Sequence, residues 1–140
     1  MKSIKTAQLA AFLDGEGCIT VLSRQRKKRS STYHIYQPHV IIANTDKRLM
    51  TWLEHNFGGW VGKQQPGYPN SKVVYTWHMT NVRELLRKVY LYLILKRGQA
   101  KIVMDFPVSL NPNGYRTEED KLRQEHAYQR IRELNRTGCE

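Results

Sequence analysis

The sequence contains few cysteines and no long apolar run. Its two cysteines, Cys18 and Cys139, are too few for an all-cysteine zinc site, and they lack the close pairing of a mixed cysteine–histidine site. We therefore expect reduced thiols in a cytoplasmic or organellar compartment. The longest apolar run, residues 89–95, is far too short for a membrane span. The first residues lack the apolar stretch and cleavage site of a secretory signal, so secretion is not expected.

Acidic residues are also scarce. Asp and Glu number 12 against 23 Lys and Arg, which gives a net charge of +11 over 140 residues. This imbalance favours a polyanionic partner, and nucleic acid is a commoner one than an anionic membrane. The length is typical of one domain, which can bury a core without disulfides or structural zinc.

Apolar periodicity predicts an alternation of helices and paired strands. The helices are expected over residues 6–13, 44–57, 81–93, 99–105 and 117–137, the last with Leu122, Tyr128, Ile131 and Leu134 on its apolar face. The strands are expected over residues 18–24, 33–43, 60–64 and 73–79, with a basic hairpin tip over residues 24–31. The order α-β-β-α-β-β-α with C-terminal helices predicts an α+β fold, with helices on one face of an antiparallel sheet.

The other sheet face must then meet something polar. Basic and amide side chains fall on the predicted strands and tips, and a two-stranded ribbon can present such groups to base edges in the DNA major groove. From the pattern alone, a solvated basic face is an equally good interpretation.

The segment Leu9-Ala10-Ala11-Phe12-Leu13-Asp14-Gly15-Glu16-Gly17 resembles the signature of the LAGLIDADG homing endonucleases. It departs from that signature at Ala11, where glycine is frequent, and at Glu16, where aspartate is frequent. Three further segments support the resemblance, which covers roughly residues 4–105: Asn44-Thr45-Asp46, Phe57-Gly58-Gly59-Trp60 and Leu95-Lys96-Arg97-Gly98-Gln99-Ala100.

The resemblance implies a single endonuclease domain over residues 1–140, with an αββαββα core at about 4–105 and a C-terminal helical extension at about 117–136. It also implies a saddle-shaped sheet. One copy of the signature implies a homodimer, and Gln8, Ala11 and Gly15 are the expected interface because they share one helical face. From the residues alone, this face could equally pack inside one chain.

Phosphodiester hydrolysis needs an activated water and relief of charge on the phosphate, which two divalent metals can supply. Mg²⁺ prefers carboxylate and carbonyl oxygens, and Glu16 is the expected carboxylate ligand. The resemblance implies that the main-chain carbonyl of Gly15 is a second ligand, that Asn44 organises metal-bound water, that Lys96 lies near the scissile phosphate and that Arg48 belongs to a basic pocket. Three alternatives stay open: Asn44 as a helix N-cap only, Lys96 exchanging roles with Arg97, and Asp14 bonding local backbone, crossing the dimer interface or binding the metal directly.

The expected function is therefore site-specific cleavage of double-stranded DNA at a pseudo-palindromic site, as in intron-encoded homing endonucleases. Mg²⁺ is the expected cofactor, with Ca²⁺ or Mn²⁺ substituting in crystals, and neither a nucleotide cofactor nor a membrane partner is expected. The expected DNA-contacting residues are Thr20, Arg24, Arg26, Lys28, Gln37, His39, Lys63, Gln64, Gln65, Lys72 and Tyr75. The rivals are a non-cleaving binder on the same fold, such as an intron-RNA splicing factor or a transcription regulator, and a basic scaffold protein.

Overall fold

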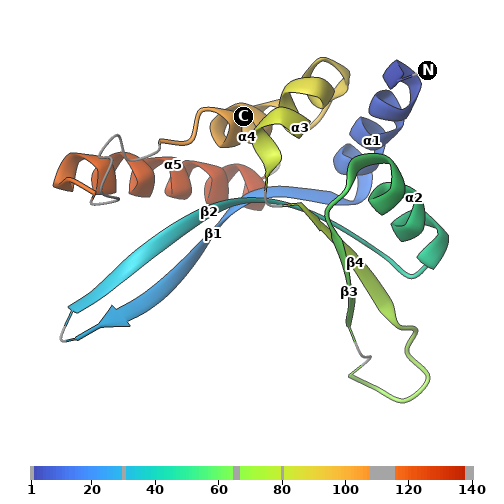
Figure 1. The fold of residues 1–140 in the computed structure, drawn as a ribbon, viewed down its shortest axis with the longest axis horizontal. Helices are drawn as coiled ribbons and strands as arrows, with labels where there is room; N and C mark the ends of the chain where they lie inside the picture. Colours follow the sequence, from blue (N-terminus) through green and yellow to red (C-terminus); the bar gives the residue numbers. More distant parts are fainter. Residues whose placement is uncertain (1, 30, 65–66, 80, 108–115, 138–140) are drawn as a thin grey trace.

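The computed structural model describes residues 2–29, 31–64, 67–79, 81–107 and 116–137. Helices alternate with antiparallel hairpins in the predicted order (Figure 1). The elements are α1 (Lys2–Glu16), β1 (Gly17–Lys28), β2 (Ser31–Asn44), α2 (Lys47–Phe57), β3 (Trp60–Gln64), β4 (Val74–Met79), α3 (Val82–Val89), the 3₁₀ turn η1 (Tyr90–Tyr92), α4 (Arg97–Met104) and α5 (Glu118–Thr137).

The four strands form one antiparallel sheet in the order β1-β2-β4-β3. All the helices lie on one side of it, and the two hairpins splay away from them like the sides of a saddle (Figure 1). The α+β class and the saddle-shaped sheet are thus confirmed. We call the sheet face that points away from the helices the concave face.

Alternation along the strands explains why the core lies on the helical side. Ile19 of β1 pairs with Val40 of β2, and Ile42 pairs with Trp77 of β4, and all four are fully buried. Successive side chains of a strand point to opposite faces, so these pairs fix the phase of the whole sheet. Leu9 and Leu13 of α1 cover this apolar layer and are also fully buried, which typically stabilises a fold by about 1.5–3 kcal/mol for each side chain.

The first hairpin differs from its prediction. The strands run to Lys28 and resume at Ser31, so the basic segment lies within β1 rather than in a long loop. The turn is tight because Arg29 adopts a positive φ of 57°. Pairing in register along the whole hairpin therefore overrides the weak strand propensity of the basic residues.

Two helical predictions also need correction. Helix α1 continues through Asp14 and Gly15 and ends at Glu16, because neither glycine of the motif adopts the left-handed conformation that would stop it. On α5, Ile131 and Leu134 are buried as expected, but Leu122 is 60% exposed, and the residues that the first turns bury are Asp120 and Gln124. The expected end of this helix at Gly138 lies outside the described residues.

In the described residues, no helix has both the length and the apolar composition of a membrane span. Cys18 is a free thiol. The other cysteine, Cys139, lies outside the described part of the chain.

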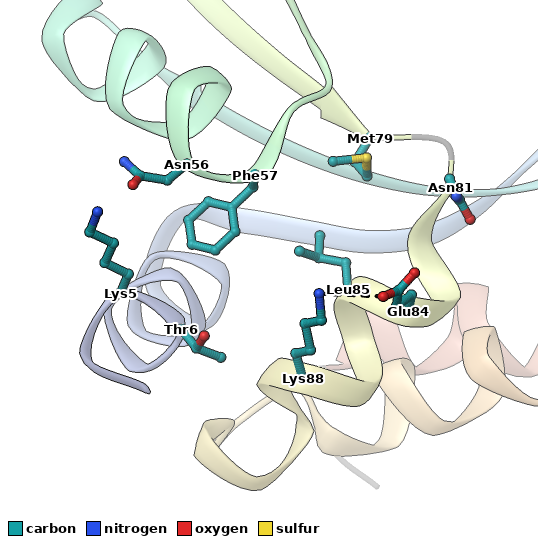
Figure 2. A pocket seen from close by; sticks show the side chains of 9 residues that line it. All are labelled: Lys5, Thr6, Asn56, Phe57, Met79, Asn81, Glu84, Leu85 and Lys88. Atoms are coloured by element: carbon teal, nitrogen blue, oxygen red, sulfur yellow. Dashed lines mark ion pairs between the residues drawn. The ribbon is translucent and has the colours of Figure 1, made fainter. Parts of the chain in front are cut away.

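A cavity of ≈ 470 Å³ opens on the helical side of the sheet, away from the concave face (Figure 2). It is bordered by the N-terminal half of α1, the end of α2 and one side of α3, where Lys88 pairs with Glu84 at 3.4 Å. Lys5, on its rim, precedes Glu16 by eleven helical positions, or about 16 Å along the axis. The cavity is therefore distinct from the site residues at the other end of α1.

Candidate active site and nucleic-acid interface

The junction between α1 and β1 presents Glu16 to solvent. Glu16 is the last residue of the helix and is exposed, as is Gly15 before it. Gly17 lets the chain turn sharply from helix to strand, because a Cβ at this position would lie only 2.8 Å from the Cα of Leu13. This turn places the carboxylate at the edge of the sheet, where the strand begins.

Asn44, the last residue of β2, is hydrogen-bonded to this carboxylate. Its Nδ2 donates to Oε2 of Glu16 at 2.8 Å. Its Oδ1 accepts the backbone N–H of Asp46 at 2.7 Å, which fixes the orientation of the amide. Asn44 is therefore not the N-cap of α2, which corrects that alternative. It links the start of α2 to Glu16.

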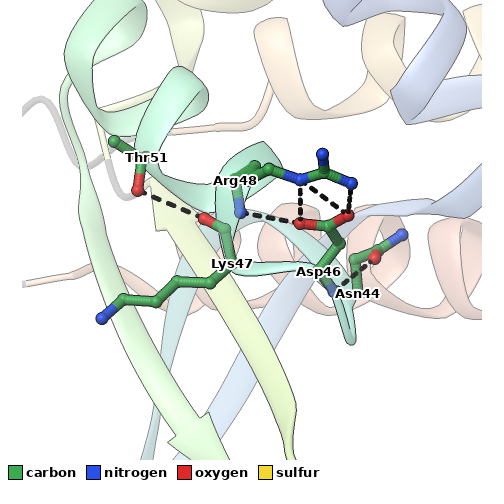
Figure 3. A network of polar contacts seen from close by, with 5 residues as sticks. All are labelled: Asn44, Asp46, Lys47, Arg48 and Thr51. Atoms are coloured by element: carbon green, nitrogen blue, oxygen red, sulfur yellow. Dashed lines mark hydrogen bonds and ion pairs between the residues drawn. The ribbon is translucent and has the colours of Figure 1, made fainter.

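Helix α2 is capped instead by Asp46, whose Oδ1 accepts the backbone N–H of Arg48 at 2.9 Å (Figure 3). The Arg48 guanidinium also binds the same carboxylate, with Nη2 at 2.6 Å from Oδ2. These hydrogen bonds from Arg48 lower the pKa of Asp46 to about 2. The Arg48 side chain is 91% exposed, so it lies beside Asn44 without being packed into the protein.

Hydrogen bonds of Asp14 and Lys96 connect the end of α1 with the start of α4, and each side chain binds the backbone of the other segment. The Asp14 carboxylate accepts the backbone N–H groups of Ile94, Leu95 and Lys96 at 2.7, 3.1 and 3.0 Å. In return, Nζ of Lys96 donates to the carbonyl of Leu13 at 2.7 Å and to the carbonyl of Gly17. Lys96 is thus anchored at the turn that carries Glu16.

Arg97 is directed elsewhere. Its Nε donates to the carbonyl of Leu93 at 2.6 Å, and its guanidinium lies 6.0 Å from the ring centre of Tyr90. Of the two neighbouring cations, Lys96 alone contacts the α1–β1 turn through an observed hydrogen bond in the described structure. Asp14 also has a structural role, because its carboxylate binds backbone N–H groups of residues 94–96, which are distant in sequence.

The chemistry of this junction fits a divalent cation. Glu16 supplies carboxylate oxygens and Gly15 a main-chain carbonyl, which are the ligand types that Mg²⁺ prefers, and both residues are exposed. Among the described residues, no three His, Cys, Asp or Glu side chains of one chain come together as a metal-binding group.

The expected interface residues lie together on the outside of α1. Gln8, Ala11 and Gly15 are exposed, and Ile4 on the same helical face is 61% exposed. A Cβ added to Gly15 would meet nothing within 4 Å in the chain. Beside this face is a groove of ≈ 540 Å³, which is lined by Gln8, Phe12, Asn44, Asp46, Arg48, Leu49 and Trp52.

The concave face carries most of the residues expected to contact DNA on the first hairpin. Strand alternation and the register place five of them on this face: Thr20, Arg24, Arg26, Gln37 and His39. Arg24 and Arg26 are exposed, whereas His39 is only 4% exposed. The side chain of Lys28, at the end of β1, lies outside the described part of the structure.

The second hairpin divides its expected residues between the two faces. Gln64 pairs with Val74 and points to the concave face, whereas Lys63 and Tyr75 form the preceding pair and point to the helical side. Tyr75 packs against the core there. The expected placement of Lys63 and Tyr75 on the concave face is thus corrected, because the buried pair Val61–Trp77 sets the phase. Lys72 is exposed in the connecting loop, and Gln65 lies outside the described residues.

Three concave-face residues were not among the expected DNA contacts. Trp60 is 51% exposed and its ring stacks on His78 at a centroid distance of 3.9 Å. His78 in turn is hydrogen-bonded to Thr76 and to His39. The alternation of Val61 and Trp77 was the available signal, because it places Trp60, Thr76 and His78 on the opposite face.

Comparisons by sequence find no matching family model and no matching curated protein. Comparison of structures finds similar proteins. The homing endonuclease I-CvuI in complex with its target superposes with a TM-score of 0.69 and 22% identity, over 98% of this chain and 96% of that chain. The homing endonuclease I-TnaI gives 0.64 and 17%, over 96% and 97%. The LAGLIDADG meganuclease I-AabMI bound to uncleaved DNA gives 0.65 and 22%, but the match covers 86% of this chain and 44% of that chain.

These matches confirm the resemblance drawn from the motif at the level of the fold. They extend over nearly the whole chain and include the C-terminal helix. The protein therefore has the fold of the single-motif LAGLIDADG homing endonucleases.

Proposed function

We propose that this protein is a site-specific double-strand DNA endonuclease, which acts as a homodimer on a pseudo-palindromic site with Mg²⁺. The observation that carries the proposal is the α1–β1 junction. There the exposed Glu16 carboxylate is oriented by Asn44, while Lys96 is tied to the same turn. An oxygen ligand, an amide and a cation at the edge of a basic sheet form the set that metal-assisted phosphodiester hydrolysis requires.

Duplex DNA is the substrate that best fits the concave face. The antiparallel ribbon β1–β2 carries exposed arginines at alternate positions, and such a ribbon can enter the major groove. The net charge of +11 favours contact with phosphates. The I-CvuI and I-AabMI structures with this fold are DNA complexes, which supports the same partner here.

A second copy of the chain is the partner that fits the outer face of α1. The exposed stripe from Ile4 to Gly15 contains the small residues Ala11 and Gly15, which allow two helix backbones to approach closely. Exposed apolar residues lie beside the end of α1, where Ile94 is 83% and Leu95 65% exposed. The match to only 44% of the longer I-AabMI chain also supports the pairing of two copies.

This pairing would bring two Glu16 carboxylates together, one from each subunit. Glu16 and the Gly15 carbonyl would hold Mg²⁺, which would supply Lewis-acid chemistry for the activation of water. The I-CvuI structures were obtained in the presence of Ca²⁺ or Mg²⁺, which supports a divalent cation.

The residues of the chain have distinct parts in this proposal. Asn44 holds the Glu16 carboxylate in one orientation through its fixed amide. The Lys96 ammonium can stabilise negative charge that develops on the phosphate, since it already lies at the turn. Arg48 is exposed and can exchange its bond to Asp46 for a phosphate oxygen. Two identical subunits read two identical half-sites, which makes the target nearly palindromic.

The test is cleavage of a plasmid library that carries randomised sites, with the wild-type protein, Glu16→Gln and the control Glu119→Gln. Glutamine keeps an oxygen that can accept the hydrogen bond from Asn44 but removes the charge. We expect cleavage by the wild type and the control, and a loss of at least about 100-fold for Glu16→Gln. DNA affinity should change by less than about threefold, and sedimentation should give a dimer.

The rival functions make different predictions in the same assay. A wild type that selects a duplex site but leaves it uncut in Mg²⁺ and Mn²⁺ would be a non-cleaving binder. A wild type that binds all duplexes equally at moderate salt would be a basic scaffold protein. Either result defeats the endonuclease proposal.

A further inference from the structure

Three polar side chains on the concave face form a continuous hydrogen-bonded chain. Nε2 of His39 lies 2.9 Å from Nδ1 of His78, and Nε2 of His78 lies 2.8 Å from Oγ1 of Thr76. His39 is on β2, whereas His78 and Thr76 are on β4, so the chain crosses between two hydrogen-bonded strands. It runs from the buried His39 to Thr76, a residue that is only half-buried.

The buried end determines which way the hydrogen bonds point. Nδ1 of His39 is buried and has no hydrogen-bond partner among the residues that the structure describes. A buried N–H without a partner is rarer in proteins than a buried acceptor without one. The proton of neutral His39 therefore lies on Nε2, which donates to Nδ1 of His78. That bond leaves the proton of His78 on Nε2, which donates to the Thr76 hydroxyl.

Thr76 is consequently left with a free hydroxyl hydrogen. A threonine hydroxyl has one donor and two acceptor positions, and His78 uses one acceptor. The hydrogen can then point outward from the concave face. The hydroxyl thus keeps its donor position and only one of its two acceptor positions, which favours donation by a group that can normally do either.

Two neighbours keep this arrangement rigid and open. The Trp60 ring lies nearly parallel to that of His78, at an interplanar angle of 10°, and restrains the imidazole. Gly62 lies opposite Thr76 on β3, and a Cβ at this position would come within 3.0 Å of Oγ1 of Thr76. Glycine therefore leaves the hydroxyl uncovered on the face proposed to meet DNA.

We propose that Thr76 is a specificity-determining residue that reads a hydrogen-bond acceptor on a base edge, and that His39 and His78 are positioning residues that fix it as a donor. This inference rests on the proposed binding of duplex DNA by the concave face. Guanine O6 and N7, adenine N7 and thymine O4 are the acceptors available in the major groove. Each half-site should contain one position with this preference.

The pKa values of His39 and His78 determine the pH at which the proposal is tested. Burial lowers the pKa of both histidines, and for His39 the neighbouring His78 and the Arg24 charge on β1 lower it further. The other concave-face neighbours on β1, β3 and β4, namely Thr20, Trp60 and Thr76, carry no charge. Both rings are thus neutral at pH 8, the pH of the tests below.

The first experiment selects sites from a randomised duplex library with the wild type, Thr76→Val and the control Thr51→Val. Thr51 is an exposed threonine of α2, on the helical side of the sheet. Thr76→Val should lose a three- to tenfold preference at one position of each half-site, as expected for one hydrogen bond, and Thr51→Val should keep it. Gly62→Ala should reduce the same preference by covering the hydroxyl.

The second experiment tests the positioning role. His39→Leu removes the donor to His78, so at pH 8 the preference at that position should relax. His39→Gln can still donate through its amide and should keep the preference at the same pH. In the wild type without DNA, nitrogen NMR of the two imidazoles should find both protons on Nε2 at pH 8, which requires no variant.

The outcomes separate this inference from the function on which it rests. A wild type that selects no duplex site overturns both. A wild type that selects a site, with an unchanged profile for Thr76→Val or with the proton of His78 on Nδ1, overturns only the proposed role of Thr76 and its histidines.

Discussion

Replacing Asp14 by asparagine should destabilise the fold and loosen the candidate site together. The carboxylate accepts three backbone N–H groups of the segment before α4, with Oδ2 taking Ile94 and Oδ1 taking Leu95 and Lys96. Asparagine keeps one acceptor oxygen and places an NH₂ group where the other oxygen was. At least one charge-assisted hydrogen bond is therefore removed, which costs about 1.5–3 kcal/mol.

The measurement is urea unfolding at a fixed protein concentration, since dimerisation would make the midpoint concentration-dependent. With an m-value of about 2 kcal/mol/M, the expected destabilisation lowers the midpoint by about 1 M. Asp105→Asn is the matched control, because Asp105 is exposed at the end of α4 and its carboxylate makes no hydrogen bond in the described structure. Its effect should stay within about 0.5 kcal/mol.

Hydrogen exchange gives a second readout of the same bonds. In Asp14→Asn, the amides of residues 94–96 should exchange faster than in the wild type, whereas those of the β1–β2 hairpin should change only as much as global stability does. Equal unfolding free energies for the two variants, or unchanged exchange at residues 94–96, would refute the role assigned to Asp14.

Further predictions follow from other residues. Gly15→Ala should leave the chain as stable or up to about 1 kcal/mol more stable, because its Cβ meets open space, but sedimentation should find weaker dimers. Gly17→Ala should cost about 1–3 kcal/mol in urea unfolding, because its Cβ would clash with Leu13. Tyr36→Phe removes the hydroxyl that donates to Glu125 and should cost about 1 kcal/mol at pH 7. Because hydrogen bonds from Gln129 and Tyr36 lower the pKa of Glu125, the stability difference of Tyr36→Phe should shrink as the pH falls below 4.5. Arg26→Ala should weaken binding to all duplexes alike and make the salt dependence shallower by about 0.9 for each phosphate that the variant no longer neutralises.

The sequence predicted the layers and most helix faces because apolar spacing is a local signal. In the first hairpin, Ile19 and Val21 alternate with polar residues, so the phase of β1 can be derived from the letters. In β3, Lys63 and Gln64 are consecutive polar residues and the strand is short, so only the pairing of Val61 with Trp77 fixes which of them points to the helices. When a neighbouring strand determines which face a residue points to, the sequence of the strand itself does not predict that face.

The candidate site was predictable in its residue types but not in its hydrogen bonds. The motif and its resemblance pointed to Glu16, Asn44 and Lys96. The bond from Asn44 to Glu16 joins residues 28 positions apart, and those between Asp14 and the start of α4 span about 80 positions. Sequence periodicity does not predict such long-range hydrogen bonds, because they depend on how α1 and α4 pack against the same end of the sheet.

The spacing of the motif constrains the site as strongly as its residue types do. Leu13 must face the sheet, Gly15 must stay outside on α1, and Gly17 must pass close to Leu13 as the chain enters β1. Each helical position turns by about 100°, so one residue inserted between Leu13 and Gly17 would rotate the later residues away from these roles. Glu16 would then leave Asn44, although every residue type of the site would remain. The spacing from Leu13 to Gly17 therefore determines three placements at once: Leu13 in the core, Gly15 on the outer face of α1 and the Glu16 carboxylate beside Asn44.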